Sequence, residues 1–116
     1  MSNVKTMKVI KIDEEQIVFD NGSYITFSHN QDCCEYNYAD FMQLRDTGIE
    51  DETFDTNLIF ETVDESGFRF GNLGRMYFVP CYSEQNGYYS TAIDIEYHKN
   101  YYDIDVINLD CELHLH

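Results

Sequence analysis

Basic residues are scarce in this sequence of 116 residues. Seven Lys and Arg stand against 22 Asp and Glu, which gives a formal net charge of −15 at pH 7. A field of that sign repels phosphate backbones and attracts basic surfaces, so we expect no direct binding of nucleic acid and a basic protein partner. The alternative interpretation is that the charge only keeps the protein in solution.

Long apolar runs are also missing. No run approaches the roughly 20 residues that a membrane-spanning helix requires, and the start of the chain, Met1 to Met7, lacks the apolar stretch of a signal peptide. We therefore expect a cytoplasmic protein with no membrane contact. Without signs of secretion, the four cysteines, Cys33, Cys34, Cys81 and Cys111, are expected to be free thiols.

Interruptions of the chain are few. Pro80 is the only proline, and repeats, linkers and low-complexity tracts are absent. Hydrophobic residues make up 43% of the chain and aromatic residues 16%, which is too much apolar material for a disordered acidic tail. The length allows one hydrophobic core, so residues 1–116 are predicted to form a single domain.

Short β-type runs dominate the pattern. Asn21-Gly22 between two apolar runs predicts a hairpin, within a meander of three strands from Lys5 to Ser28. Further strands are predicted at Asn57 to Val63, Phe68 to Phe70 and Arg75 to Tyr82, with turns at residues 71–74 and 83–87. Period-two alternation over residues 91–98 and 107–116 predicts a terminal hairpin with its acids on the exposed face.

One segment has helical rather than alternating spacing. Tyr38, Phe41, Met42 and Leu44 predict a short helix over Tyr36 to Leu44, and residues 46–55 read as a loop. The predicted fold class is α+β and mostly β. We expect one antiparallel sheet of about six to eight strands with one short helix, either curled into a partial barrel or covered on one side.

Acidic residues are the candidate binding residues. Between Asp46 and Glu65 there are eight acids and no Lys or Arg, and a second set alternates along the terminal hairpin. Such surfaces bind cationic partners through complementary charge. The candidate partner-binding residues are Glu50, Asp51, Glu52, Asp55, Glu61, Asp64, Glu65, Asp94, Glu96, Asp103, Asp105, Asp110 and Glu112.

Catalytic and metal chemistry receive little support from the residues. The acids beside Cys33 and Cys34 raise a thiol pKa, which disfavours a cysteine nucleophile, and adjacent cysteines lack the spacing of zinc ligands. The more ordinary interpretation of residues 29–35 is a turn whose cysteines pack inward. We expect no enzyme, cofactor or metal; the alternative is a metal-binding protein that uses His29, Asp32, Cys33 or the terminal His114 and His116.

Two motifs carry a resemblance. H-x-Q-D-C-C-E occupies residues 29–35, and S-x-x-N-G-Y-Y-S occupies residues 83–90. Together they resemble a family of small uncharacterised phage and prophage proteins, over roughly Met7 to Tyr97. Glu84 and Gln85 lengthen the second motif, and the C-terminal strand is additional. The resemblance implies a phage origin and a host bacterial cell, and it implies no particular activity.

Three hypotheses follow for the function. The first is an acidic inhibitor of a basic, nucleic-acid-binding host protein, similar in charge and size to some anti-CRISPR proteins that act on Cas9-type nucleases. A domain of this length is about 35 Å across, a span over which duplex DNA carries about 20 charges. The second is an accessory or structural phage protein, whose aromatic residues form the interface. The third is the metal-binding protein above. The oligomeric state is left open.

Overall fold

The computed structural model describes residues 5–28, 36–85, 91–100 and 102–115. The described strands are β1 (Thr6–Met7), β2 (Val9–Ile12), β3 (Gln16–Phe19), β4 (Tyr24–Ser28), β5 (Tyr36–Ala39), β6 (Phe54–Asp55), β7 (Ile59–Val63), β8 (Gly67–Asn72), β9 (Arg75–Gln85), β10 (Ala92–His98), β11 (Ile104–Asp110) and β12 (Glu112–Leu115). Two short 3-10 helices, η1 (Phe41–Leu44) and η2 (Ile49–Asp51), lie between β5 and β6. Among the described residues no helix has the length and apolar character needed to cross a bilayer.

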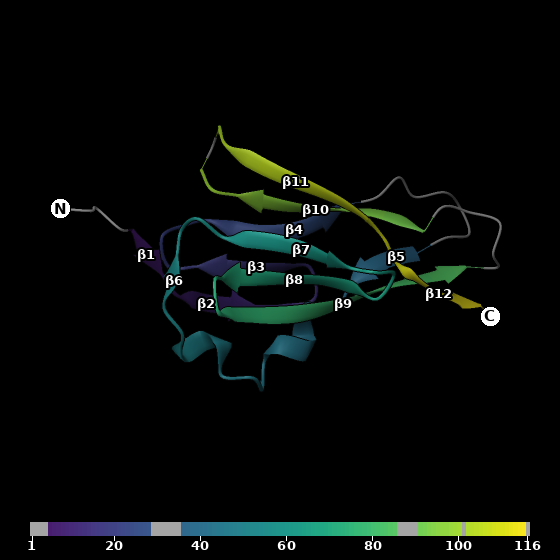
Figure 1. The fold of residues 1–116 in the computed structure, drawn as a ribbon, viewed down its shortest axis with the longest axis horizontal. Helices are drawn as coiled ribbons and strands as arrows, with labels where there is room; N and C mark the ends of the chain where they lie inside the picture. The colour runs from purple at the N-terminus through teal and green to yellow at the C-terminus, as the bar shows by residue number, and fades with distance from the viewer. Residues whose placement is uncertain (1–4, 29–35, 86–90, 101, 116) are drawn as a thin grey trace.

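Two five-stranded sheets form the body of the molecule (Figure 1). One has the order β11-β10-β4-β3-β2, and the other runs β12-β9-β8-β7 with β5 also paired to β9. A small third sheet joins β1 to β6. The mostly β fold is therefore confirmed. The strands are divided between packed sheets, and in the part of the chain described here they do not close into a barrel.

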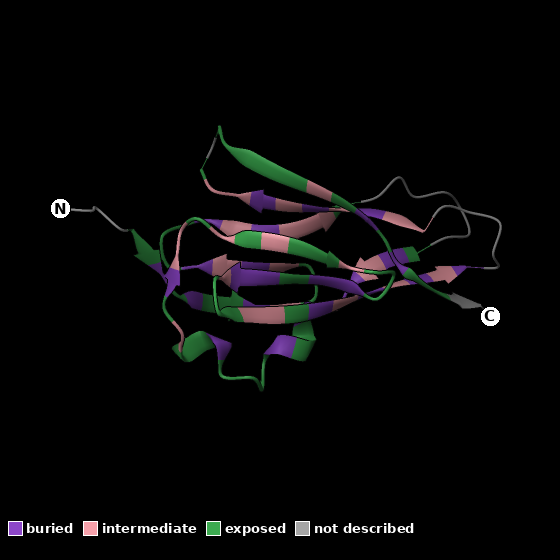
Figure 2. Ribbon diagram, in the orientation of Figure 1, coloured by how far each residue is buried: buried purple, intermediate pink, exposed green. Residues whose placement is uncertain are grey.

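Aromatic side chains fill the space between the sheets. The Phe60 ring of β7 lies 5.6 Å from the Tyr97 ring of β10, and Phe19 of β3 lies 6.2 Å from Phe54 of β6. Phe68 and Phe70 of β8 are fully buried in the same cluster. Figure 2 shows the consequence, because β8 is mostly buried between its neighbours while β11 is largely exposed at its edge.

Close packing imposes a glycine at the start of β8. Gly67 has a φ of +151°, and a Cβ built on it would lie 2.1 Å from the carbonyl oxygen of Val79 on β9. Only glycine tolerates both the backbone conformation and the approach.

Several predicted strands are confirmed. The meander appears as antiparallel β2-β3-β4, and the terminal hairpin as antiparallel β10-β11. The first predicted strand is interrupted at Lys8, whose backbone N–H donates to the Asp20 side chain at 3.0 Å. The residues before the break form β1 and pair with β6 instead of the meander.

The predicted helix over Tyr36 to Leu44 is wrong in its first half. Residues 36–39 form β5, which pairs antiparallel with β9, and only Phe41–Leu44 are helical, as a 3-10 turn. Asn37 and Ala39 are buried while the alternate tyrosines are more exposed, so the segment has period two. The apparent helical spacing arose because residues of a strand and of the following turn were counted together.

Three other boundaries differ from the prediction. Residues 83–85 extend β9 instead of turning, and the predicted loop at 46–55 contains η2 and β6. The predicted last strand is divided at Cys111: β11 belongs to one sheet, whereas β12 pairs parallel with β9 in the other. The reason for the extension of β9 is a buried polar network, in which Ser83 donates to Asn37 and Gln85 donates to Ser83.

Candidate acidic binding surfaces

Most carboxylates of this protein are not neutralised internally. Among the described residues, five contact a lysine or an arginine, namely Asp13, Glu52, Glu61, Asp103 and Asp105. The remaining described acids have no such partner. Even the five paired carboxylates keep 26% to 56% of their side-chain surface exposed, and such exposed ion pairs are weak. The net charge of −15 is therefore a property of the surface.

The acids between Asp46 and Glu65 do not form one patch. Glu50 and Asp51 are exposed on η2, and Asp64 and Glu65 are exposed on the β7–β8 turn, at the opposite end of β7 (Figure 1). Two acids between these ends are paired with bases. Glu52 forms an ion pair with Arg75, and Glu61 forms one with Arg69 on the neighbouring strand.

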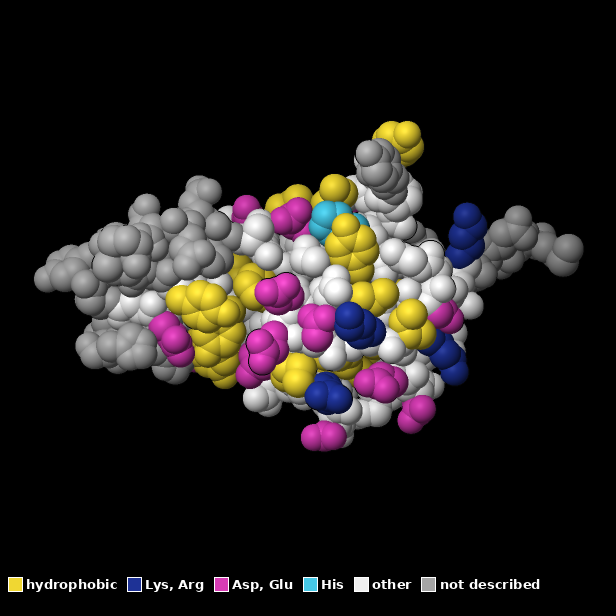
Figure 3. Space-filling view, turned by 180° about the vertical axis from the view of Figure 1, so that it is seen from behind, with side chains coloured by type: hydrophobic (Ala, Val, Ile, Leu, Met, Phe, Trp, Pro, Cys, Tyr) yellow, Lys and Arg dark blue, Asp and Glu magenta, His cyan; other side chains and the backbone are white. Residues whose placement is uncertain are grey.

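The acids of the terminal strands are also divided. Asp94, Glu96 and Asp110 share the outer face of β10 and β11, because Ala92 is paired with Asp110 and Asp94 with Asn108. Glu96 accepts a hydrogen bond from Ser28 at 2.7 Å, and Asp94 accepts one from Asn108 at 2.7 Å. Figure 3, which views the molecule from behind, shows acidic side chains interspersed with uncharged and apolar ones.

Asp103, Asp105 and Glu112 do not belong to that outer face. Asp105 is paired with Tyr97, whose side chain points into the core, and Glu112 lies on β12 in the other sheet. Lys99 binds both aspartates, with its Nζ 3.0 Å from Asp105 and 3.6 Å from Asp103. The prediction that these acids form one exposed face is thus correct for only half of them.

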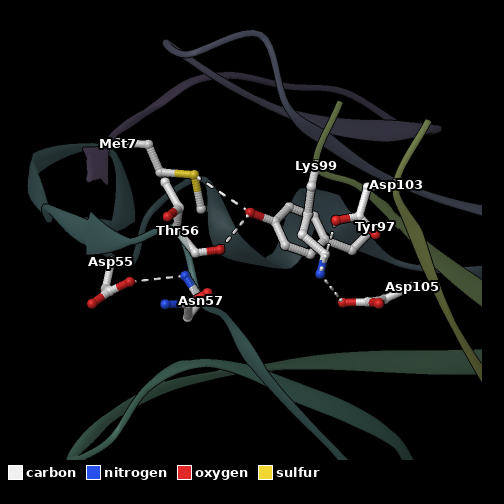
Figure 4. Close-up of polar contacts among 8 residues, drawn as sticks. All are labelled: Met7, Asp55, Thr56, Asn57, Tyr97, Lys99, Asp103 and Asp105. Carbon is white, nitrogen blue, oxygen red and sulfur yellow. Dashed lines mark hydrogen bonds and ion pairs between the residues drawn. The ribbon is translucent and has the colours of Figure 1, made fainter. Parts of the chain in front are cut away.

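The structure brings the two acidic sets together around one tyrosine (Figure 4). The Tyr97 hydroxyl donates to the Thr56 carbonyl at 2.9 Å, beside Asp55 of the first set and Asp105 of the second. Burial is the main cause of the raised pKa of Tyr97; a hydrogen bond with Ser23 and the charge of Lys99 lower it, and the charges of Asp105 and Asp55 raise it. These contacts hold the β6–β7 connection against β10, so this meeting point is a structural contact rather than an open site.

A recess that the sequence did not reveal lies beside β5. Its walls come from β5, the start of η1 and the β2–β3 turn, and its cavity volume is about 210 Å³. The turn is held by Asp13, whose carboxylate accepts the backbone N–H groups of Glu15 and Gln16 at 2.8 and 2.9 Å. These hydrogen bonds lower the pKa of Asp13. The residues lining the recess are Glu14, Tyr36, Tyr38, Ala39, Asp40 and Met42.

The recess was missed because its parts are distant in sequence. Tyr36 and Tyr38 were assigned to a helix, in which residues two apart lie on different faces. In the strand they share one face, and their rings stack at 5.1 Å. The only available signal was the alternation of Tyr36 and Tyr38 with Asn37 and Ala39.

The described cysteines and candidate metal ligands do not form a reactive or metal-binding cluster. Cys81 on β9 and Cys111, which lies between β11 and β12, are buried free thiols. A hydrogen bond from the Cys81 thiol to Cys111, together with burial, raises the pKa of Cys81, which opposes formation of a thiolate nucleophile. No three His, Cys, Asp or Glu side chains of the described residues gather to hold a metal. His29, Asp32, Cys33 and the side chains of His114 and His116 lie outside the described part, as do residues 29–35 of the first motif.

Fold and surface together define an acidic β protein built mainly from two five-stranded sheets. A domain of unknown function, DUF7448, matches residues 2–95, and the chain belongs to that family. The match covers nearly the same span as the resemblance to an uncharacterised family. Searches of curated proteins and of solved structures found no match.

Proposed function

We propose that this protein is an acidic, phage-type inhibitor that acts in the host cytoplasm. It binds the cationic nucleic-acid-binding surface of a host defence protein, for example a Cas9-type nuclease. The observation that carries the proposal is the small number of described carboxylates, five, that meet a lysine or arginine in a chain of net charge −15. A field that is not neutralised internally attracts a basic groove and accelerates encounter with it.

The size and charge of the molecule indicate how it would compete with nucleic acid for a basic groove. Its principal axes extend 53 × 31 × 23 Å, and duplex DNA as long as the first axis carries about 30 phosphate charges. The net charge of −15 is about half of that. The divided acids and the lower charge density support competition by general electrostatic attraction, not a copy of phosphate spacing.

The first experiment is a pull-down from host lysate with the immobilised protein, eluted with rising salt and identified by mass spectrometry. The proposal predicts that a nucleic-acid-binding protein elutes at intermediate salt and that DNA or RNA competes for it. Retention that is insensitive to salt, or a partner that nucleic acid does not displace, would contradict the proposal.

Two variants of equal charge then locate the contact. Glu50→Gln/Asp51→Asn removes two exposed acids that have no Lys or Arg partner among the described residues, and it leaves the Glu52–Arg75 pair intact. Leu73→Lys/Tyr102→Lys changes the net charge equally at side chains that are 92% and 90% exposed. A contact on η2 predicts a larger loss of affinity for the first variant.

A second function is favoured by one observation at the sheet edge. β11 is paired only with β10 among the described strands, and its Ile104 and Val106 side chains are 45% and 58% exposed. An edge strand with exposed apolar side chains pairs readily with another chain. This supports an accessory or structural phage protein that self-associates. Light scattering after size exclusion tests it: Val106→Lys should convert an oligomer to a monomer, and a monomeric wild type would contradict it.

A further inference from the structure

The recess beside β5 combines aromatic walls with acidic ones. Tyr36 stacks on Tyr38 at 5.1 Å with an angle of 27° between the rings, and Tyr38 meets Tyr82 of β9 at 5.5 Å. The three rings form a row on the outer side of β5 and β9. Figure 3 shows a group of side chains of the hydrophobic class, which includes tyrosine, with acidic side chains beside it, at the end of the molecule where β5 lies.

Carboxylates lie beside this row of rings. Glu14 and Asp40 line the recess, and burial raises the pKa of Tyr38 together with the charges of Glu84 and Asp40. The electrostatic potential at the ring is therefore negative. The negative faces of aromatic rings and the carboxylates both attract a cation, so the two kinds of wall favour the same ligand.

No cation of the described residues occupies the recess. Its described lining contains no lysine or arginine, and Lys11, which lies closest in sequence to the β2–β3 turn, pairs with Asp13 at 3.5 Å. Asp40 accepts a hydrogen bond from the neutral Gln43 amide at 3.1 Å. The negative charge of the recess is therefore not neutralised by a lysine or arginine of the described residues, and a cationic group of a partner could neutralise it.

We propose that the recess binds the guanidinium group of an arginine side chain from a protein partner. The proposal rests on the proposed function, since it names the group that anchors a basic partner. Arginine fits because its planar, weakly hydrated head stacks on rings and binds carboxylates, whereas the lysine ammonium is compact and strongly hydrated. A cavity of about 210 Å³ takes one side chain and is smaller than the roughly 300–1,000 Å³ of small-molecule sites.

The test is fluorescence anisotropy with a labelled peptide of alternating glycine and arginine, and with its lysine counterpart, at fixed salt. Tyr36→Leu/Asp40→Asn removes one ring and one charge from the recess. Tyr102→Leu/Asp64→Asn makes the same chemical changes at exposed positions elsewhere. We expect the recess variant to bind the arginine peptide about tenfold more weakly, the control to change less than twofold, and the preference for arginine over lysine to disappear in the recess variant.

A measurement on the wild type removes dependence on the folding of the variants. Met42 lines the recess, whereas Met76 of β9 is not among its described lining residues, so methyl NMR of labelled methionine reports the site. The arginine peptide should shift the Met42 resonance and leave that of Met76 in place. Equal shifts, equal loss in both variants, or equal affinity for the two peptides overturns the inference.

Failure of the inference and failure of the proposed function give different results. If the peptide binds through general charge alone, both double variants weaken binding equally and only the recess assignment falls. If the recess selects arginine while the lysate yields no partner that nucleic acid displaces, the inhibitor function falls and the arginine site stands.

Discussion

Two groups of aromatic side chains lie in different parts of the molecule. The interior group lies between the sheets and touches apolar neighbours; it consists of Phe19, Phe54, Phe60, Phe68, Phe70 and Tyr97. The exterior group, Tyr36, Tyr38 and Tyr82, lies along β5 and β9 among carboxylates. The rings of both groups are about 5 to 6.5 Å apart, centroid to centroid, as is usual for aromatic pairs.

The difference lies in burial and charge. Phe68 and Phe70 have no exposed surface, whereas Tyr36 is 49% exposed. Removing a ring from the interior leaves a cavity, whereas removing one from the exterior leaves no enclosed cavity and costs little stability. The interior group therefore contributes more to stability than the exterior group, which lies at the surface.

The largest expected effect comes from Phe70→Ala. The side chain is fully buried and its ring lies 6.0 Å from Phe60 and 6.1 Å from Phe68, so truncation should lower the free energy of unfolding by about 3–5 kcal/mol. Urea denaturation measures it. Phe78→Ala, at a residue 43% exposed, is the control and should cost less than about 1.5 kcal/mol; equal losses would remove the distinction between the groups.

A smaller loss is expected from Tyr97→Phe, which keeps the interior ring and removes its polar end. The hydroxyl donates to the Thr56 carbonyl at 2.9 Å (Figure 4), and its loss leaves that carbonyl without this donor. The free energy of unfolding should fall by about 1–1.5 kcal/mol in the same denaturation experiment. No change would show that the ring alone holds the β6–β7 connection.

Asp13→Ala tests the turn that forms one wall of the recess. Its folded-state pKa is lowered, chiefly by the hydrogen bond from the Glu15 backbone, so its stabilisation is present at neutral pH and disappears as the pH falls below about 4. After allowance for its exposure, we expect a loss of about 0.5 kcal/mol at pH 7 and a smaller one at pH 3. Asp13→Asn keeps an acceptor and should lose less; a loss that is independent of pH would contradict this account.

The smallest effect on stability is expected from Tyr36→Ala in the exterior group. The side chain is 49% exposed, so the free energy of unfolding should change by less than about 0.5 kcal/mol. Affinity for the arginine peptide should nevertheless fall. A variant that loses stability as Phe70→Ala does would show that the exterior tyrosines belong to the core.

Hairpins and alternating strands could be predicted from local signals. The turn around Asn21-Gly22 and the alternation around Ile93 and Ile95 correctly gave β3-β4 and β10-β11. The segment at Tyr36 was misassigned because its pairing partner, β9, lies more than 40 residues away. Ser83 and Gln85 read as a turn because they are polar, and the buried hydrogen bonds from Ser83 to Asn37 and from Gln85 to Ser83 become visible only in the folded chain.

The sequence by itself determined the β-rich class, the charge of −15 and the scarcity of internal cations, because these depend on composition and on short-range periodicity. Only the tertiary structure decided which acids lie together, that the last strand changes sheet at Cys111, and that Glu14 and Asp40 flank stacked tyrosines. The physical reason is that the burial of apolar side chains across the whole chain fixes strand order and register. That order decides which residues lie side by side at the surface.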